Sequence, residues 1–443
     1  MGNKIKETVL ESIFRLKRNF APGLPPAQRC FDGVEIAPFR HGAQASVTIS
    51  ADFELSWACR GWRSAEETRL KAARERCNVS YLVPLLEEYD IPVTWATVGH
   101  LFLERCERGA DGRAHPQMPR PIMATRRAMV RWTGDWYAHD PCTDYRLDPL
   151  WYCPDLIRLI LGSRVRHEIA SHSFSHISFL AQNSTPDLVE QEIAQCQAAM
   201  SPFGLSPRSL VYPYNHMGHH YAPLLARLGL TCVRHRDPVI RLSYPERLAC
   251  GIYKLYESMN LRRPKYYSYI DKVRTFLDEA MERHAAYHIW FHPSDPTELF
   301  QHEFCAIVQE IAARQRAGHL WVATMADVAS YCEARERTEL EVRRGANDLT
   351  ITLRSDYDSG RYGDTKLTLR IRSDRLPITC SVRVRDQSEP VKWKREDSYR
   401  AKCDAPSFLV DVPTDARQLF VSFQNAHVSK TQRSPTITDP ALC

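Results

Sequence analysis

The feature that most constrains this chain is a regular alternation of short apolar runs with amphipathic segments, which continues from residue 45 to residue 323. Strands are expected at 45–51, 93–98, 168–170, 209–212, 231–234, 287–291 and 320–323. Segments with helical spacing separate them, at 79–90, 154–161, 186–200, 223–228, 269–284 and 299–317. A strand–helix–strand order makes consecutive strands parallel, so the pattern predicts a (β/α) barrel or an open doubly wound sheet.

Two regions depart from this alternation. Residues 104–150 form a polar insert with several aromatic side chains, as is typical of functional loops. From residue 338, apolar and polar residues alternate, which predicts an appended antiparallel β-sandwich-like domain. The predicted organisation is an N-terminal extension with a basic amphipathic helix at 1–40, a barrel at 41–335, a β-domain at 338–428 and a flexible tail at 429–443.

Composition excludes several classes of protein. Lys and Arg total 59 against 53 Asp and Glu, and this net charge of +6 has no dense basic run, so no nucleic-acid partner is expected. We expect no transmembrane segment, and the N-terminus lacks the apolar core of a secretory signal. A cytoplasmic protein with reduced thiols is therefore predicted, and a weak membrane-surface contact by the N-terminus is left open. The sequence does not indicate the oligomeric state.

Polar clusters follow four of the expected strands. Asp52 and Glu54 come after the first, His172 and His176 after the third, residues 213–216 after the fourth, and His292 after the sixth. The carboxyl ends of parallel strands meet at one edge, so these side chains should gather there. One carboxylate with two histidines makes a metal set with open positions, a second carboxylate could deprotonate water, and a further histidine could protonate a leaving amine.

Five stretches in this order resemble the polysaccharide deacetylase family, which is also called the NodB homology domain or carbohydrate esterase family 4. They are residues 46–57, 91–99, 168–176, 211–214 and 289–292, and Glu-Ile-Ala-Ser-His-Ser-Phe-Ser-His at 168–176 is the most specific. The resemblance implies a distorted (β/α)7-type barrel and metal-dependent hydrolysis of an N-acetyl group, usually on a sugar.

The resemblance also implies a role for each matching residue. Glu54, His172 and His176 would bind the metal and Asp52 would be the base, although the roles of Asp52 and Glu54 could be exchanged. The Tyr214 N–H would stabilise the oxyanion, and His292 would be the general acid. Zn²⁺ suits two histidines and one carboxylate best, and Co²⁺, Ni²⁺ or Fe²⁺ would also fit.

Two positions depart from the family pattern. Val211 stands where the third motif normally has an arginine that orients the base, and Arg234 or His216 could substitute for it. No clear fourth-motif acid accompanies His292, and Asp237 is the nearest candidate.

Aromatic and polar residues near these motifs are candidates for substrate binding. The rings of Trp57, Trp132, Trp136 and Trp151 could stack on a sugar ring or simply pack in the core. Three polar residues could also contact substrate, namely His139, Asn215 and His216. The predicted partner is a carbohydrate or another acetylated small molecule. Two alternatives stay open: hydrolysis of another C–N or ester bond of a small acylated intermediate, and a catalytically degenerate carbohydrate-binding protein.

Overall fold

The computed structural model describes residues 30–122, 134–237, 242–261, 268–385, 387–396 and 406–423. The predicted N-terminal amphipathic helix before residue 30, the predicted tail at 429–443 and Trp132 lie outside these ranges. None of the helices in the described ranges has the length and hydropathy needed to span a bilayer.

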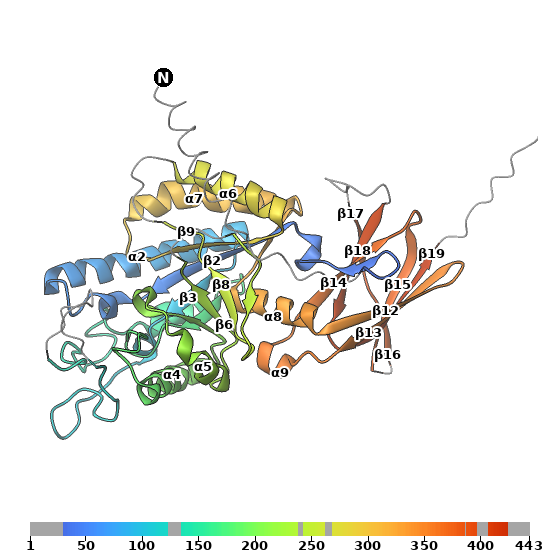
Figure 1. Cartoon of the computed structure of the whole chain (residues 1–443). Helices are drawn as coiled ribbons and strands as arrows, with labels where there is room; N and C mark the ends of the chain where they lie inside the picture. Colours follow the sequence, from blue (N-terminus) through green and yellow to red (C-terminus); the bar gives the residue numbers. More distant parts are fainter. Residues whose placement is uncertain are drawn as a thin grey trace, which may run out of the picture.

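A curled sheet of ten strands forms the first half of the molecule, shown on the left of Figure 1. Its order is β7-β8-β6-β5-β4-β3-β2-β10-β9, with β11 also paired to β2, and every pair is parallel except β7 with β8. The strands are β2 (Ala45–Phe53), β3 (Thr94–Thr97), β4 (Glu168–Ser171), β5 (Ser209–Val211), β6 (Cys232–His235), β7 (Glu246–Arg247), β8 (Tyr253–Tyr256), β9 (Met259–Asn260), β10 (Ala286–Phe291) and β11 (Leu320–Val322). The sheet is a half-barrel, so the predicted distorted barrel is confirmed.

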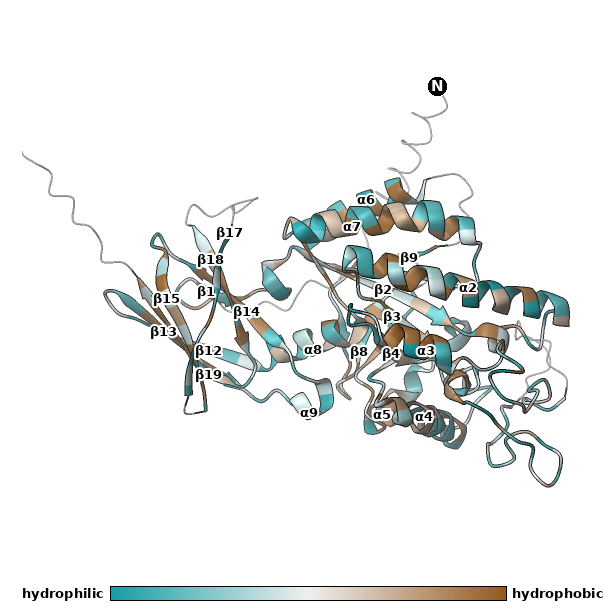
Figure 2. Ribbon diagram, turned by 180° about the vertical axis from the view of Figure 1, so that it is seen from behind, coloured by the Kyte–Doolittle hydropathy of each residue, from teal (hydrophilic) through white to brown (hydrophobic). Residues whose placement is uncertain are grey.

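Helices cover this sheet, and α2, α6 and α7 lie on the opposite side from α4 and α5 (Figure 1). Their bounds are α2 (Ala65–Tyr89), α3 (Pro154–Leu161), α4 (Pro186–Met200), α5 (Ala222–Arg227), α6 (Tyr269–Arg283), α7 (Cys305–Arg316) and α8 (Met325–Glu336). They carry both hydrophobic and hydrophilic residues along their length (Figure 2), as expected of helices with one face on a core. Five of these helices fall within a few residues of the predicted segments, and α8 was not predicted.

Helix α2 begins fourteen residues before the predicted segment at 79–90. Its first half is too polar for the apolar periodicity to reveal it. A capping box starts it: Ser64 accepts the Glu67 N–H, and the Glu67 carboxylate accepts the Ser64 N–H. The helix ends at Tyr89, and Asp90 caps it in the left-handed conformation.

Two antiparallel sheets form the second half of the molecule. One has the order β1-β14-β18-β17 and the other β12-β13-β19-β15-β16, with apolar side chains of both in one core. The bounds are β1 (Val34–Ile36), β12 (Thr338–Arg344), β13 (Asp348–Ser355), β14 (Lys366–Arg372), β15 (Pro377–Val384), β16 (Gln387–Pro390), β17 (Trp393–Glu396), β18 (Ser407–Pro413) and β19 (Ala416–Phe423). The C-terminal sandwich of the predicted fold is therefore confirmed, while the exact domain limits stay a prediction.

Strand β1 comes from the region that was expected to be an N-terminal extension. It pairs antiparallel with β14, so the sandwich takes one strand from before the barrel. With only three residues, β1 is too short for a pattern of apolar and polar residues to predict this pairing. The chain therefore crosses from the sandwich into the barrel and returns to the sandwich through α8.

Candidate active site

The candidate site lies where four strands of the half-barrel end. Asp52 is the next-to-last residue of β2, and Glu54 follows that strand directly. His172 follows β4, Tyr214 follows β5, and His292 follows β10. The parallel arrangement brings these carboxyl ends to one edge of the sheet.

The three predicted metal ligands lie close together. Glu54 Oε1 lies 3.1 Å from His172 Nε2 and 3.0 Å from His176 Nε2, and all three side chains are buried. Residues 172–176 form a loop instead of the helical turn considered from the sequence, because Ser173 and His176 have left-handed backbone conformations. Sharp turns in this loop, rather than an i, i+4 helical spacing, place both rings beside Glu54.

The chemistry of these donors fits a divalent cation. His172 Nδ1 donates to the Val211 carbonyl at 2.8 Å, since a carbonyl can only accept. In the neutral ring, Nε2 therefore offers a lone pair toward Glu54 Oε1. Burial lowers the pKa of His176 to about 4, so this ring is neutral near pH 7. Lone pairs of two imidazoles and a carboxylate that converge in this way suit Zn²⁺ or a similar metal.

Asp52 lies beside this triad and is held by Arg234. The guanidinium donates to both carboxylate oxygens, at 2.5 Å to Oδ1 and 2.7 Å to Oδ2. Burial alone would raise the pKa of Asp52, but the charge and hydrogen bonds of Arg234 outweigh it and lower this pKa below its ordinary value. Arg234 is itself stacked on Trp290, with 4.5 Å from its guanidinium carbon to the ring centre.

Of the two residues considered as substitutes for the missing arginine, Arg234 contacts Asp52. The imidazole of His216 instead contacts Ser178, with 2.9 Å between Nδ1 and the hydroxyl oxygen. Val211 contributes only its carbonyl, through the bond to His172. An arginine on β6 thus reaches the position expected of an arginine at the end of β5.

His292 faces both carboxylates from β10. Its Nε2 lies 3.9 Å from Asp52 Oδ2 and 4.0 Å from Glu54 Oε2. The acid next to the other ring nitrogen is Asp295, whose Oδ2 lies 4.0 Å from His292 Nδ1. The same oxygen accepts the backbone N–H of His292 at 3.3 Å. Asp237, the candidate from the sequence, instead interacts electrostatically with His235. The spacing His-x-x-Asp in one loop was the signal for Asp295.

A cavity of about 520 Å³ opens onto Asp52, Glu54, His176 and His292. Tyr214 and Asn215 also line it, and both have left-handed backbones, with φ of 59° and 53°. Such strained conformations often accompany functional sites. The two tryptophans among its lining residues are Trp62, at 44% exposure, and the buried Trp290. Neither was singled out from the sequence.

The predicted aromatic walls lie elsewhere. Trp57 and Trp136 are buried on either side of Arg60, whose guanidinium carbon is 4.3 and 4.5 Å from their ring centres. Trp151 packs edge-on against Trp57, with 5.6 Å between ring centres. These contacts match the core-packing alternative. His139 is exposed on the insert, and neither it nor His216 is among the residues that line the cavity.

Two buried glutamates support the loops that carry the candidate metal ligands. Glu75 on α2 accepts the backbone N–H groups of Glu54 at 2.8 Å and Leu55 at 3.1 Å. Glu192 on α4 accepts the Ser175 N–H at 2.8 Å and its hydroxyl at 2.6 Å. Sequence reasoning missed both, although each is an acid on the apolar face of a helical segment.

Comparison with known proteins gives one family match. Residues 71–233 match the model of the polysaccharide deacetylase family. The resemblance to the polysaccharide deacetylases is confirmed. The matched segment includes His172, His176 and Tyr214, whereas Asp52, Glu54 and His292 lie outside it. A search of curated proteins finds no match.

Several solved structures are similar to this chain. A protein described as a polysaccharide deacetylase from Mycobacterium smegmatis is 18% identical, with 73% of this chain and 99% of that chain covered and a TM-score of 0.48. Puue allantoinase is 13% identical, with 66% and 92% covered and a TM-score of 0.45. A family 4 carbohydrate esterase from Streptomyces lividans in complex with acetate is 12% identical, with 63% and 91% covered and a TM-score of 0.32.

Proposed function

We propose that this chain is a metal-dependent deacetylase that removes an N-acetyl group from an amino sugar or a glycan-type substrate. The family match supports a deacetylase-type hydrolase. The observation that carries the finer proposal is the convergence of Glu54, His172 and His176 beside an Asp52 that Arg234 holds ionised.

The metal, when bound by Glu54, His172 and His176, would polarise the amide carbonyl and lower the pKa of the attacking water. Asp52 accepts the proton of that water, because each of its oxygens keeps a lone pair beside those that Arg234 occupies. The Tyr214 N–H stabilises the charge that develops on the carbonyl oxygen.

Collapse of the intermediate breaks the C–N bond. His292 faces the cavity and donates a proton to the departing nitrogen, while Asp295 lies beside Nδ1 and orients its ring. The products are acetate and a free amine. We assign the base to Asp52 rather than Glu54, because Glu54 Oε1 lies against both imidazoles of the proposed metal set.

A second candidate substrate class is a small acylated intermediate with another C–N or ester bond. Three cationic side chains among the cavity's lining residues favour it, namely Arg63, Lys71 and Arg236. Their positive charges would attract an anionic small molecule more strongly than an uncharged glycan.

The test is acetate release from a panel of N-acetylated glycans and acylated small molecules, with the zinc-loaded full chain. We expect His176→Ala to lose activity and one equivalent of zinc. The matched control is His302→Ala, at an exposed position on the surface, which should keep both. Full activity of His176→Ala, or a wild type that releases acetate from no member of the panel, would contradict the proposal.

A further inference from the structure

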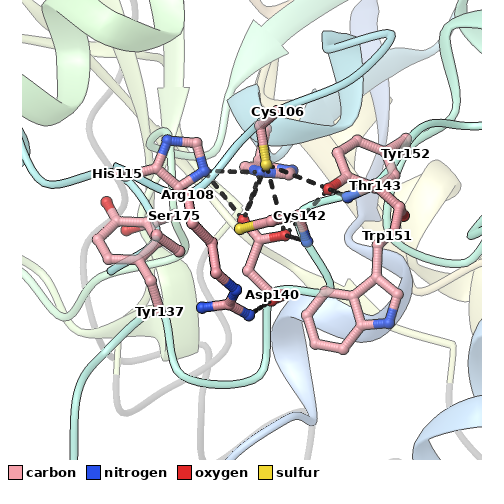
Figure 3. A network of polar contacts seen from close by, with 12 residues as sticks. Cys106, Arg108, His115, Tyr137, Asp140, Cys142, Thr143, Trp151, Tyr152 and Ser175 are labelled. Carbon is pink, nitrogen blue, oxygen red and sulfur yellow. Dashed lines mark hydrogen bonds and ion pairs between the residues drawn. The ribbon is translucent and has the colours of Figure 1, made fainter. Parts of the chain in front are cut away.

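A second cluster of potential metal ligands lies outside the candidate active site. It consists of His100, Cys106, His115 and Asp140. His100 Nε2 and His115 Nε2 are 3.0 Å apart, and each is 2.9 Å from Asp140 Oδ2. Cys106 Sγ lies 3.5 Å from the same oxygen. Figure 3 shows Cys106, His115 and Asp140 pointing toward one another.

Hydrogen bonds alone cannot satisfy this arrangement. His100 Nε2, His115 Nε2 and Asp140 Oδ2 form three close pairs, and each nitrogen carries at most one hydrogen. If both nitrogens donate to Asp140, the two nitrogens, 3.0 Å apart, both carry a hydrogen and have no hydrogen bond between them. If one donates to the other, the acceptor's lone pair is used and it cannot donate to Asp140. A cation among the three atoms removes the conflict, because all of them then present lone pairs to it.

The distances agree with a small tetrahedral ion. Ligands of four-coordinate zinc are separated by about 3.3 Å between nitrogen or oxygen atoms and about 3.6 Å from those atoms to sulfur. The other oxygen of Asp140 is already occupied, since Oδ1 accepts the Cys142 N–H at 2.9 Å and the Tyr152 hydroxyl at 3.0 Å. This fixes Oδ2 toward the two imidazoles. His100 and Asp140 are 0% and 1% exposed, so bulk solvent does not reach these atoms.

We propose that His100, Cys106, His115 and Asp140 form a second, structural zinc site. Two nitrogens, one thiolate and one carboxylate supply four protein ligands, which leaves no position for substrate. The site is therefore closed, unlike the triad of Glu54, His172 and His176. It is independent of the proposed deacetylase activity.

The position of this cluster explains what the ion would do. His100 belongs to the short helix η3 (Gly99–Phe102) after β3, and the other three ligands belong to the insert at 104–150. The described residues of that insert form no regular helix or strand, and turn and loop hydrogen bonds connect them instead of a continuous ladder. A zinc ion would fasten the insert to the barrel.

The cluster also contacts the turn that follows Glu54. The ring of Trp57 packs on His100 with 4.3 Å between ring centres. Trp57 lies in the turn that follows Glu54. The zinc site would therefore support the position of Glu54 from behind.

The first test is the zinc content of the purified full chain by elemental analysis. We expect two equivalents in the wild type, one in His115→Ala and one in His176→Ala, because each variant empties a different site. If His115→Ala keeps as much zinc as the wild type, the proposal fails. The zinc content of His115→Ala tests the second site, and that of His176→Ala tests the proposed function. Failure of one proposal is therefore distinguished from failure of the other.

The second test uses Co²⁺, because a thiolate ligand gives a charge-transfer band that a site of histidines and carboxylates lacks. We expect this band in the wild type and in His176→Ala, and its loss in Cys106→Ser. The matched control is Cys142→Ser in the same insert, which should keep the band. A wild type without the band, or a band that survives in Cys106→Ser, would overturn the assignment.

The third test is limited proteolysis of the wild type, which does not depend on whether a variant folds. Chelation of zinc should increase the rate of cleavage within the insert at least tenfold, and added zinc should reverse this. His176→Ala, which retains the structural site, should show the same protection by zinc. Equal cleavage of the insert with and without zinc would contradict the structural role.

Discussion

At the scale of single residues, Arg234 sets the protonation state of the proposed base. Its guanidinium and the Asp52 carboxylate are 2% and 4% exposed and make two hydrogen bonds. A buried carboxylate whose cation is removed is left unpaired, which typically costs about 3–5 kcal/mol. The pair is thus required for the charge of Asp52 and not only for its position.

Replacing Arg234 should shift the pH dependence of hydrolysis. Arg234 lowers the pKa of Asp52, so Arg234→Met should raise it, and the acidic limb of the kcat/KM profile should move to higher pH. We also expect kcat to fall at least tenfold at pH 7, with partial recovery in Arg234→Lys. The profile would be measured against Arg227→Met, an exposed position at the end of α5. An acidic limb that does not move would show that Asp52 is not the base.

At the scale of elements, the site is built from strand ends and is fixed from behind by helices. The strands could be predicted because apolar runs stop at Asp52, His172, Tyr214 and His292, where parallel strands meet at one edge. The glutamates that support the site could not be predicted. Glu75 and Glu192 resemble ordinary helix residues in the sequence, and only the tertiary fold buries them against loop N–H groups. The choice of Arg234 over His216 depends on the distance between β6 and β2, which no local pattern contains, whereas the His-x-x-Asp spacing gave a local signal for Asp295.

The role of α2 can be tested through Glu75. Glu75→Leu removes the acceptor for the Glu54 and Leu55 N–H groups, so the Glu54 carboxylate should lose its fixed position. Such supporting contacts typically change metal affinity by 10- to 100-fold, and we expect a loss in that range at the Glu54 site. Competition with a chelator measures it, and Glu88→Leu, exposed on the same helix, is the control. Equal zinc affinity of both variants would refute the role of Glu75.

At the scale of the whole molecule, barrel and sandwich share an apolar core. Helix α8 lies between them, and its Tyr331 is fully buried, with its hydroxyl donating to the Ala37 carbonyl at 2.9 Å. On the other side of α8, Glu333 accepts from Arg247 of β7 and from Tyr253 of β8. Two halves joined in this way should unfold together, which the separate hydrophobic patterns of the sequence did not indicate.

Truncation of Tyr331 tests this coupling. Tyr331→Ala leaves a cavity between barrel and sandwich and should lower the free energy of unfolding by about 3–5 kcal/mol. Tyr331→Phe loses only the hydroxyl and should cost about 1 kcal/mol. Thermal unfolding should show one transition that shifts as a whole. A variant in which one half unfolds separately while the other keeps the wild-type Tm would contradict a shared core.

The most direct test of the central claim is an anomalous difference map at the zinc edge, from crystals of the full chain grown with zinc. The account predicts a peak within bonding distance of Glu54, His172 and His176, on the side of the cavity that Asp52 and His292 face. A map of the zinc-loaded, active protein with no peak at these three residues would contradict it.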